Sequence, residues 1–265
     1  KGLLISIDQD TNAIEYSKKR LEKFGSKWKV FKGNFENIDT IAYMAGVDKV
    51  DGILMDIGVS SKQLDDPERG FSYRYDVKLD MRMNIEQKIS AYDVVNTYSE
   101  EQLSKIIFEY GEERHARKIA KLIVEERKSS PIEKTSDLIT LIKRAYPERS
   151  SKHPAKKTFQ AIRIEVNREL EVLENAISKA VELLKVGGRL AIITFHSLED
   201  RIVKNKFKDL ATACKCPKDI PICVCGGVKK FEIITKKPII PVDDELKNNN
   251  RAHSSKLRIL ERILD

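Results

Sequence analysis

The stretch GGRLAIITF at residues 187–195 decides how the whole chain is organised. It follows a helical pattern in which Phe159, Ile162 and Val166 begin a series of apolar residues at spacings of three and four. This pattern predicts one long helix up to the glycines. The two glycines end the helix, and the apolar run behind them has the composition of a buried strand. Helix, glycine turn and strand in this order are typical of α/β proteins with parallel strands.

The same alternation fills the N-terminal third of the chain. Strands are predicted at residues 2–8 (GLLISID), 29–33 (KVFKG) and 50–56 (VDGILMD), with an amphipathic helix at 11–25 between the first two. We therefore expect a doubly wound sheet, because strands that alternate with helices pair in parallel.

The strand patterns stop in the middle of the chain, where Pro131, Pro147 and Pro154 separate short helical patterns. This change predicts an all-helical domain at residues 84–157, inserted between two parts of the sheet domain at 1–83 and 158–265.

The composition bounds the class of protein. The chain has 265 residues, and 49 basic against 41 acidic side chains give a net charge of +8. This balance favours a polyanionic partner, although runs of charge also occur as solvated surfaces. No apolar stretch approaches the ~20 residues of a membrane helix, and no signal peptide is recognisable, so we expect a cytoplasmic protein without a membrane partner.

Polar side chains stand at the ends of three predicted strands, where parallel sheets bind their ligands. Asp8 could accept hydrogen bonds from ribose hydroxyls or cap the next helix, although Asp10 and Thr11 stand closer to that helix. Asp56 ends the third strand. His196 could accept a proton near neutral pH, or it could be a structural histidine at a strand end.

Three further patterns have both a functional and a structural interpretation. Phe35 could pack on an adenine ring or belong to the core. Ser197 and Asp200 fit a capping box, which predicts Ser197 as the N-cap of the following helix. Two C-x-C pairs suit either a zinc site or a reduced, cysteine-rich surface loop; they are formed by Cys214, Cys216, Cys223 and Cys225.

Several long blocks together resemble the signature blocks of the bacterial small-subunit ribosomal RNA cytosine-N4 methyltransferases, which use S-adenosylmethionine. The blocks are DGILMDIGVSSKQLDDPERGFSY (51–73), LDMRMN (79–84), YGEERHARKIAKLIV (110–124), KTFQAIRIEVNREL (157–170) and GGRLAIITFHSLEDRIVK (187–204). The resemblance covers almost the whole chain. In the tail (250–262), Asn250 and His253 stand where the family usually has proline and arginine.

This resemblance implies a class I methyltransferase sheet, which is Rossmann-like, with a helical insertion. It implies methyl transfer to the N4 amine of a cytidine in the decoding region of 16S ribosomal RNA. It places Asp8 on the cofactor ribose and Phe35 on the adenosyl group, with Asp56 and Gln63 on the methionine and target side. It also implies an earlier strand and a glycine-rich cofactor loop, which this sequence does not contain.

The target base needs further contacts. Ser60 and Ser61 offer uncharged hydrogen-bonding groups, and His196 is a further candidate on the substrate side. No proline-proline-aromatic run follows Asp56, so the aromatic clamp on the base would be Phe71 or Tyr73.

The expected partner is 16S ribosomal RNA within the small subunit or a late precursor of it, and a homodimer is left open. Two alternatives stay open as well: an RNA-binding or assembly protein without catalysis, or a methyltransferase that acts on another nucleic acid.

Overall fold

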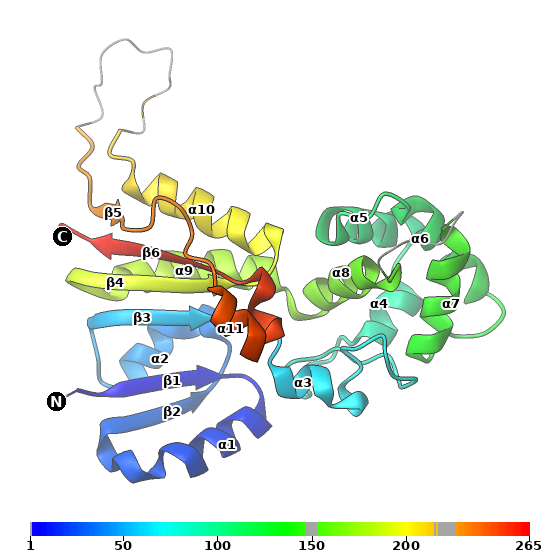
Figure 1. The fold of residues 1–265 in the computed structure, drawn as a ribbon, viewed down its shortest axis with the longest axis horizontal. Coiled ribbons are helices and arrows are strands. Elements are labelled where there is room, and N and C mark those ends of the chain that lie inside the picture. The colour runs from blue at the N-terminus through cyan, green and yellow to red at the C-terminus, as the bar shows by residue number, and fades with distance from the viewer. Residues whose placement is uncertain (1, 147–152, 215, 217–225) are drawn as a thin grey trace. The chain divides into compact units, whose positions relative to one another are not determined.

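The computed structural model describes residues 2–146, 153–214, 216 and 226–265. The chain divides into two compact units (Figure 1). Lys1–Gly58 and Leu170–Asp265 form the first, which we call the sheet unit, and Val59–Glu169 form the second, which we call the helical unit. The predicted insertion at 84–157 lies inside the helical unit, which extends further at both ends.

Parallel strand pairs form the beginning of the sheet unit. Strand β1 (Leu4–Asp8) pairs with β2 (Trp28–Lys32), and β3 (Val50–Asp56) pairs with β4 (Leu184–Thr194). The apolar runs of the sequence therefore form the strands that were predicted, with β4 longer at its start. The helical elements before β3 are α1 (Thr11–Leu21), η1 (Glu22–Lys27), η2 (Phe35–Asn37) and α2 (Ile38–Met44).

The C-terminal part of the sheet corrects the expectation of parallel pairing throughout. Strand β6 (Lys256–Arg262) lies antiparallel between β4 and β5 (Phe231–Ile233), which gives the order β3-β4-β6-β5. The tail of the chain is therefore an internal strand. Helix α10 (Ser197–Ala211) packs against β5 and β6. The segment between β5 and β6 carries α11 (Asp243–Asn248) and η4 (Asn250–Ser254).

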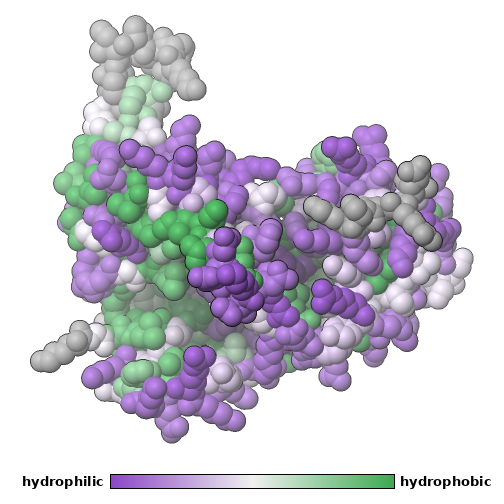
Figure 2. Space-filling view, viewed as in Figure 1, coloured by the Kyte–Doolittle hydropathy of each residue, from purple (hydrophilic) through white to green (hydrophobic). Residues whose placement is uncertain are grey.

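The strands belong to two separate sheets. In the described part of the chain, β1 is bonded only to β2, and β3 only to β4, so each has one free edge. Figure 1 shows the arrowheads of β1, β2 and β3 pointing the same way. Leu4 on β1 and Leu54 on β3 are exposed, although apolar side chains within strands are usually covered. In the view of Figure 2, hydrophobic surface gathers over the sheet unit, whereas the helical unit is mainly hydrophilic.

A buried ion pair joins α10 to β6. Arg258 donates from Nε to Oδ1 of Asp200 at 2.7 Å, and Lys256 donates to Oδ2 at 3.0 Å. Burial alone would raise the pKa of Asp200, but the hydrogen bonds and charges of Arg258 and Lys256 outweigh it and lower that pKa. The hydrophobic core of the sheet unit includes Met55, Leu173, Ile177, Leu190, Ile192, Val203, Phe207 and Leu260.

The helical unit has its own core, formed by apolar faces of its helices. Its elements are α3 (Ser61–Asp65), η3 (Pro67–Arg69), α4 (Ala91–Thr97), α5 (Glu100–Gly111), α6 (Ala116–Glu126), α7 (Thr135–Ala145) and α8 (Ala155–Asn167). The prediction of one long helix from residue 159 onward is wrong, because Arg168 adopts left-handed backbone angles (φ 49°) and ends α8. Helix α9 (Glu169–Leu183) starts afresh, so the break coincides with the boundary between the two units.

A network of hydrogen bonds fixes the loop that precedes α4. Asn167 donates to the carbonyl oxygen of Met81 and accepts from the amide of Met83, both at 2.8 Å. Met81 is fully buried with a positive φ of 59°, a conformation that costs free energy unless its surroundings hold it. Among the described helices none is long and apolar enough to cross a membrane.

Candidate functional site

Asp56 ends β3 next to β4. The amide of Ile57 donates to the carbonyl oxygen of Ile193 at 3.3 Å, which keeps the two strands together one residue beyond the carboxylate. Solvent reaches Asp56, yet the surrounding protein displaces enough water to raise the pKa of its carboxyl group. No residue in the described part of the chain forms a hydrogen bond or ion pair with this side chain. A partly desolvated carboxylate without a partner can accept a hydrogen bond from a ligand.

Asp8 and Phe35 lie at neighbouring strand ends. Asp8 is paired with Lys32 in the β1–β2 register, and the amide of Gly33 donates to its carbonyl oxygen at 2.9 Å. Phe35 begins η2 just beyond, half-buried against the core of the sheet unit. The structure therefore places both residues at the same edge of the β1–β2 pair.

Asp8 is exposed to solvent, but the surrounding protein displaces part of the water around its carboxylate, and this desolvation raises the pKa. The hydrogen bond from the Asp10 amide to Oδ1 acts in the opposite direction and is outweighed. Helix α1 is capped by Asp10, whose side chain accepts from the amide of Asn12. Asp8 is thus not the N-cap, and its carboxylate oxygens keep the capacity to accept further hydrogen bonds.

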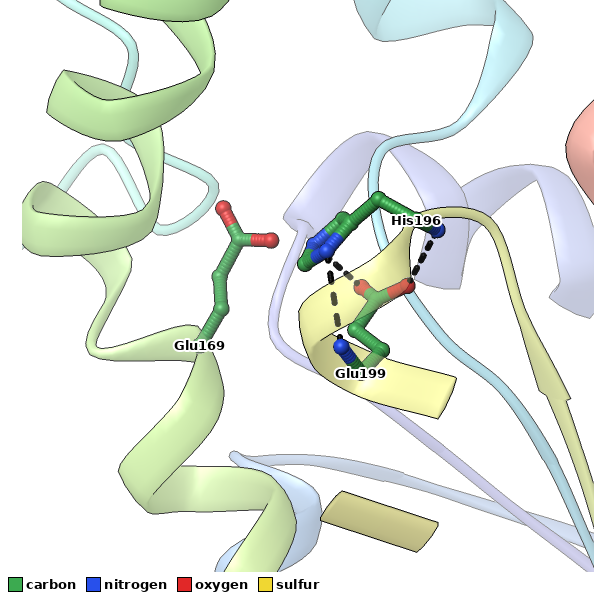
Figure 3. A group of neighbouring side chains, drawn as sticks. All are labelled: Glu169, His196 and Glu199. Carbon is green, nitrogen blue, oxygen red and sulfur yellow. Dashed lines mark hydrogen bonds and ion pairs between the residues drawn. The ribbon is translucent and has the colours of Figure 1, made fainter. Parts of the chain in front are cut away.

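His196 caps α10 (Figure 3). Its Nδ1 atom accepts from the amide of Glu199 at 3.4 Å, so the neutral ring carries its proton on Nε2. The Glu199 carboxylate accepts in return from the amides of Phe195 and His196. The predicted capping box is therefore displaced by one residue, and Ser197 is the first residue of the helix.

This cap gives His196 a structural role. Its Nδ1 lone pair accepts from the Glu199 amide, which is the contact that caps the helix. Glu199, which is only 2% exposed, was missed as a member of the strand-end region. The H-x-x-E spacing from His196 was a signal that could have identified it.

Gly58 brings the chain close to this cap. It has a positive φ of 97°, and a Cβ atom there would lie 3.7 Å from Cδ2 of Phe195 and 3.9 Å from Oε1 of Glu199. These are ordinary contacts, so the backbone conformation and not crowding favours glycine. The turn after Asp56 and the turn after β4 are therefore neighbours.

Ser60, Ser61 and Gln63 belong to the helical unit. Ser60 and Gln63 form a capping box: Ser60 Oγ accepts from the Gln63 amide at 3.2 Å, and Gln63 Oε1 accepts from the Ser60 amide at 3.0 Å. The local function of both side chains is to start α3. Ser61 is its first residue and is exposed.

The two aromatic clamp candidates have different surroundings. Phe71 is 6% exposed and lies in the core of the helical unit, a position that does not suit a base clamp. Tyr73 is half-buried and stacks on His153 with ring centroids 4.4 Å apart. Only Tyr73 of the two reaches a partly accessible position.

The cysteine prediction falls partly on residues that the structure does not describe. Cys214 is exposed and Cys216 is half-buried, while Cys223 and Cys225 lie outside the described residues.

Comparison with known proteins places the chain among the methyltransferases. The model of the MraW methylase family matches residues 1–263, so the chain belongs to that family. A protein of Fusobacterium nucleatum subsp. nucleatum, "Ribosomal RNA small subunit methyltransferase H", is 97% identical over 265 residues, which are 100% of this chain and 84% of the relative.

More distant relatives carry the same name. The protein of Clostridioides difficile is 54% identical, with 99% of this chain and 86% of the relative covered. The protein of Clostridium botulinum (strain Kyoto) is 56% identical, with 99% and 85% covered.

Proposed function

We propose that this protein transfers a methyl group from S-adenosylmethionine to the exocyclic N4 amine of a cytidine in 16S ribosomal RNA. Family membership and the name of the relatives support methylation of small-subunit ribosomal RNA. The observation that carries the chemistry is the Asp56 carboxylate, which has a raised pKa and no partner in the described part of the chain.

The architecture fits a class I methyltransferase whose sheet is interrupted by a helical domain. The parallel pairs β1–β2 and β3–β4 and the antiparallel strand β6 support the sheet, and the separate core of the helical unit supports the insertion. The predicted domains at 1–83, 84–157 and 158–265 place the insertion inside this helical unit, which runs from Val59 to Glu169.

The residues at the β1–β2 edge fit the cofactor. S-Adenosylmethionine supplies an electrophilic methyl group on a sulfonium sulfur. The exposed Asp8 carboxylate, which can accept further hydrogen bonds, would hold the ribose hydroxyls. Phe35 would contact the adenosyl group. It is half-buried and lies three residues after Lys32, which pairs with Asp8 in the register of the two strands. Gln63 is proposed on the methionine side.

Asp56 would act on the target amine. The N4 lone pair of cytosine is delocalised into the ring, so the amine is a poor nucleophile. By accepting a hydrogen bond from the amine, Asp56 would favour the geometry of attack, and its raised pKa makes it a better acceptor for the proton that leaves after transfer. Orientation of well-placed groups can be worth ~7–11 kcal/mol, so positioning would supply much of the rate. Ser60 and Ser61 follow along the chain as further polar groups.

The cysteines favour N4 over carbon 5 as the methylated atom. Methylation at carbon 5 normally needs a cysteine thiolate in the pocket, which attacks the ring. All four cysteines of the sequence lie within residues 214–225, and none directly follows the predicted strands that end at Asp8 and Asp56. Zinc binding by these cysteines is a separate prediction, which the methyl transfer does not require.

The substrate is proposed to be 16S ribosomal RNA in the small subunit or a late precursor, in the decoding region, in the cytoplasm. A homodimer stays an open prediction.

Mass analysis of ribosomal RNA nucleosides from cells with and without this protein tests the function. We expect N4-methylcytidine to disappear when the protein is removed and to return with the wild-type gene. A 5-methylcytidine signal that follows the protein would contradict the proposed atom. An unchanged nucleoside profile together with RNA binding would favour the alternative of an assembly protein without catalysis.

A further inference from the structure

An aromatic stack lies on the helical unit. The rings of Tyr73 and His153 are stacked face to face, with centroids 4.4 Å apart and planes inclined by 12°. Tyr73 also meets the buried Phe159 edge-on, at 5.9 Å and 85°. Phe159 therefore anchors Tyr73 to the core, and His153, which is exposed, is the outer member of the stack.

The His153 ring is held in place before any ligand arrives. Its Nδ1 atom accepts from the amide of Ala155 at 3.3 Å, which leaves the proton on Nε2. Burial lowers the pKa of His153, and the charge of Lys143 lowers it further. The ring is therefore neutral at pH 7 and offers a flat surface with one donor. A ring ordered in advance loses little conformational entropy when a ligand stacks on it.

The surroundings of the stack are positively charged. Lys143, Lys156 and Lys157 are exposed, and the first turn of α8 contains no acidic residue. Lys157 donates to the carbonyl oxygen of Glu112. Lys143 and Lys156 have no ion pair with any residue that the structure describes. Cations beside an exposed aromatic ring are the combination with which proteins hold unpaired nucleotides, since the rings stack on bases and the cations attract phosphates.

We propose that the Tyr73–His153 stack is a binding site for an unpaired base of the RNA substrate, with Lys143 and Lys156 beside the adjoining phosphates. The proposal rests on the proposed function in so far as RNA is the substrate. It changes the role of Tyr73, which supports the stack from below, and it gives His153 direct contact with RNA.

Binding of a short single-stranded RNA that contains the fluorescent base 2-aminopurine tests the site. We expect the wild-type protein to quench the fluorescence, and His153→Ala to weaken RNA binding about tenfold, in line with the loss of one stacked base. His153→Phe keeps the flat ring and should bind within about threefold of wild type. His253→Ala, which removes an exposed histidine of the sheet unit, is the matched control and should leave affinity unchanged.

The salt dependence separates stacking from charge. Lys156→Ala should reduce the slope of log affinity against log salt by about one, whereas His153→Ala should keep the slope. Because His153 is exposed, its variants should melt at the wild-type temperature. If His153→Ala bound as wild type, or if His153→Phe lost as much affinity as His153→Ala, the stacking site would be wrong. Equal displacement of the RNA by poly-glutamate would point to an acidic protein partner and would overturn the proposal too.

Nucleoside analysis of the methylated RNA distinguishes this failure from failure of the proposed function. If the wild-type protein makes N4-methylcytidine and His153→Ala retains full RNA affinity, the proposed stacking site is wrong and the proposed function stands. If quenching depends on His153 but the protein makes no methylated nucleoside, the proposed enzymatic function is wrong and the stacking site stands.

Discussion

Two aspartates of one sheet unit illustrate how position sets the role of a residue. Asp8 and Asp56 both follow apolar strands, and burial raises the pKa of each. Asp8 has the Asp10 amide on its carboxylate, whereas Asp56 has no partner in the described part of the chain. The sequence could identify both residues, because polar groups at the ends of apolar runs are visible in it. It could not decide between His196 and Ser197 as the cap of α10, since that depends on the orientation of the His196 ring.

The first prediction separates the roles of the two aspartates. Asp8→Ala should weaken binding of S-adenosylmethionine about 10- to 100-fold, because hydrogen bonds to a charged group contribute ~1.5–3 kcal/mol. Asp56→Ala should lower the single-turnover rate about 100-fold or more and change cofactor affinity little. Calorimetry and single-turnover assays measure the two effects. Asp51→Ala, at the exposed start of β3, is the control, and an unchanged rate in Asp56→Ala would refute its catalytic role.

The second prediction concerns the pH dependence of stability. Because the pKa of Asp56 is raised in the folded state, the folded protein binds its proton more tightly than the unfolded chain does. Stability therefore falls as the pH rises from the ordinary value of ~3.9 through the raised pKa. Asp56→Asn should raise the melting temperature slightly at pH 7 and have no effect near pH 3. Thermal melts at both pH values measure this, and a destabilised variant at pH 7 would contradict it.

At the level of secondary structure, local patterns were sufficient where one short segment decides its own conformation. The strands β1 to β4 follow from apolar runs, and the short helical patterns between the prolines correspond to the helices of the helical unit. The break at Arg168 was not predictable, because the apolar spacing continues across it while the backbone turns left-handed. Strand β6 was missed for another reason: its place between β4 and β5 depends on partners distant in the sequence.

The third prediction tests the ion pair between α10 and β6. Arg258→Ala leaves Asp200 buried without its main partner and should cost about 3–5 kcal/mol in the free energy of unfolding. Lys256→Ala removes the more exposed partner, at 39% side-chain exposure, and should cost less than about 1 kcal/mol. Denaturant unfolding measures both.

The pH dependence of this ion pair has the opposite sign to that of Asp56. The pKa of Asp200 is lowered in the folded state, so its contribution is present above the ordinary carboxyl pKa and is lost as the pH falls through the lowered value. The difference in the free energy of unfolding between wild type and Arg258→Ala should therefore shrink in acid. A difference that does not change with pH would contradict the ion pair.

The fourth prediction compares two glycines with similar positive φ angles. A Cβ atom on Gly70 (φ 68°) would lie 2.7 Å from the carbonyl oxygen of Lys78, whereas one on Gly46 (φ 74°) would meet nothing within 4 Å. Gly46→Ala should lower the free energy of unfolding by about 1–2 kcal/mol, which is the conformational strain alone. Gly70→Ala adds the clash to the same strain, so its loss should be at least about twice as large. Chemical denaturation of the two variants decides it, and equal losses would mean that the loop at Lys78 can move away.

At the level of the whole molecule, β1 and β3 each have one edge that no described strand covers. The family resemblance implies a further strand and a glycine-rich cofactor turn, which the sequence does not contain. We predict that a version of the chain that includes them binds S-adenosylmethionine at least about tenfold more tightly than the 265-residue chain. Calorimetry compares the two, with an equally long glycine-serine extension as the control. Equal affinities of all three would mean that the cofactor needs neither element.

The discontinuity of the sheet unit has a consequence for the order in which the protein can fold during its own synthesis. The helical unit is one continuous segment, complete once Glu169 has left the ribosome. Strand β3 must then wait for β4, and the four-stranded sheet cannot close before β6 (Lys256–Arg262) has been made. Residues 1–58 are therefore made before the helical unit, whereas β3 finds its partner β4 only after it, so a nascent chain halted before β4 would expose β3 to proteases while its helical unit resists cleavage.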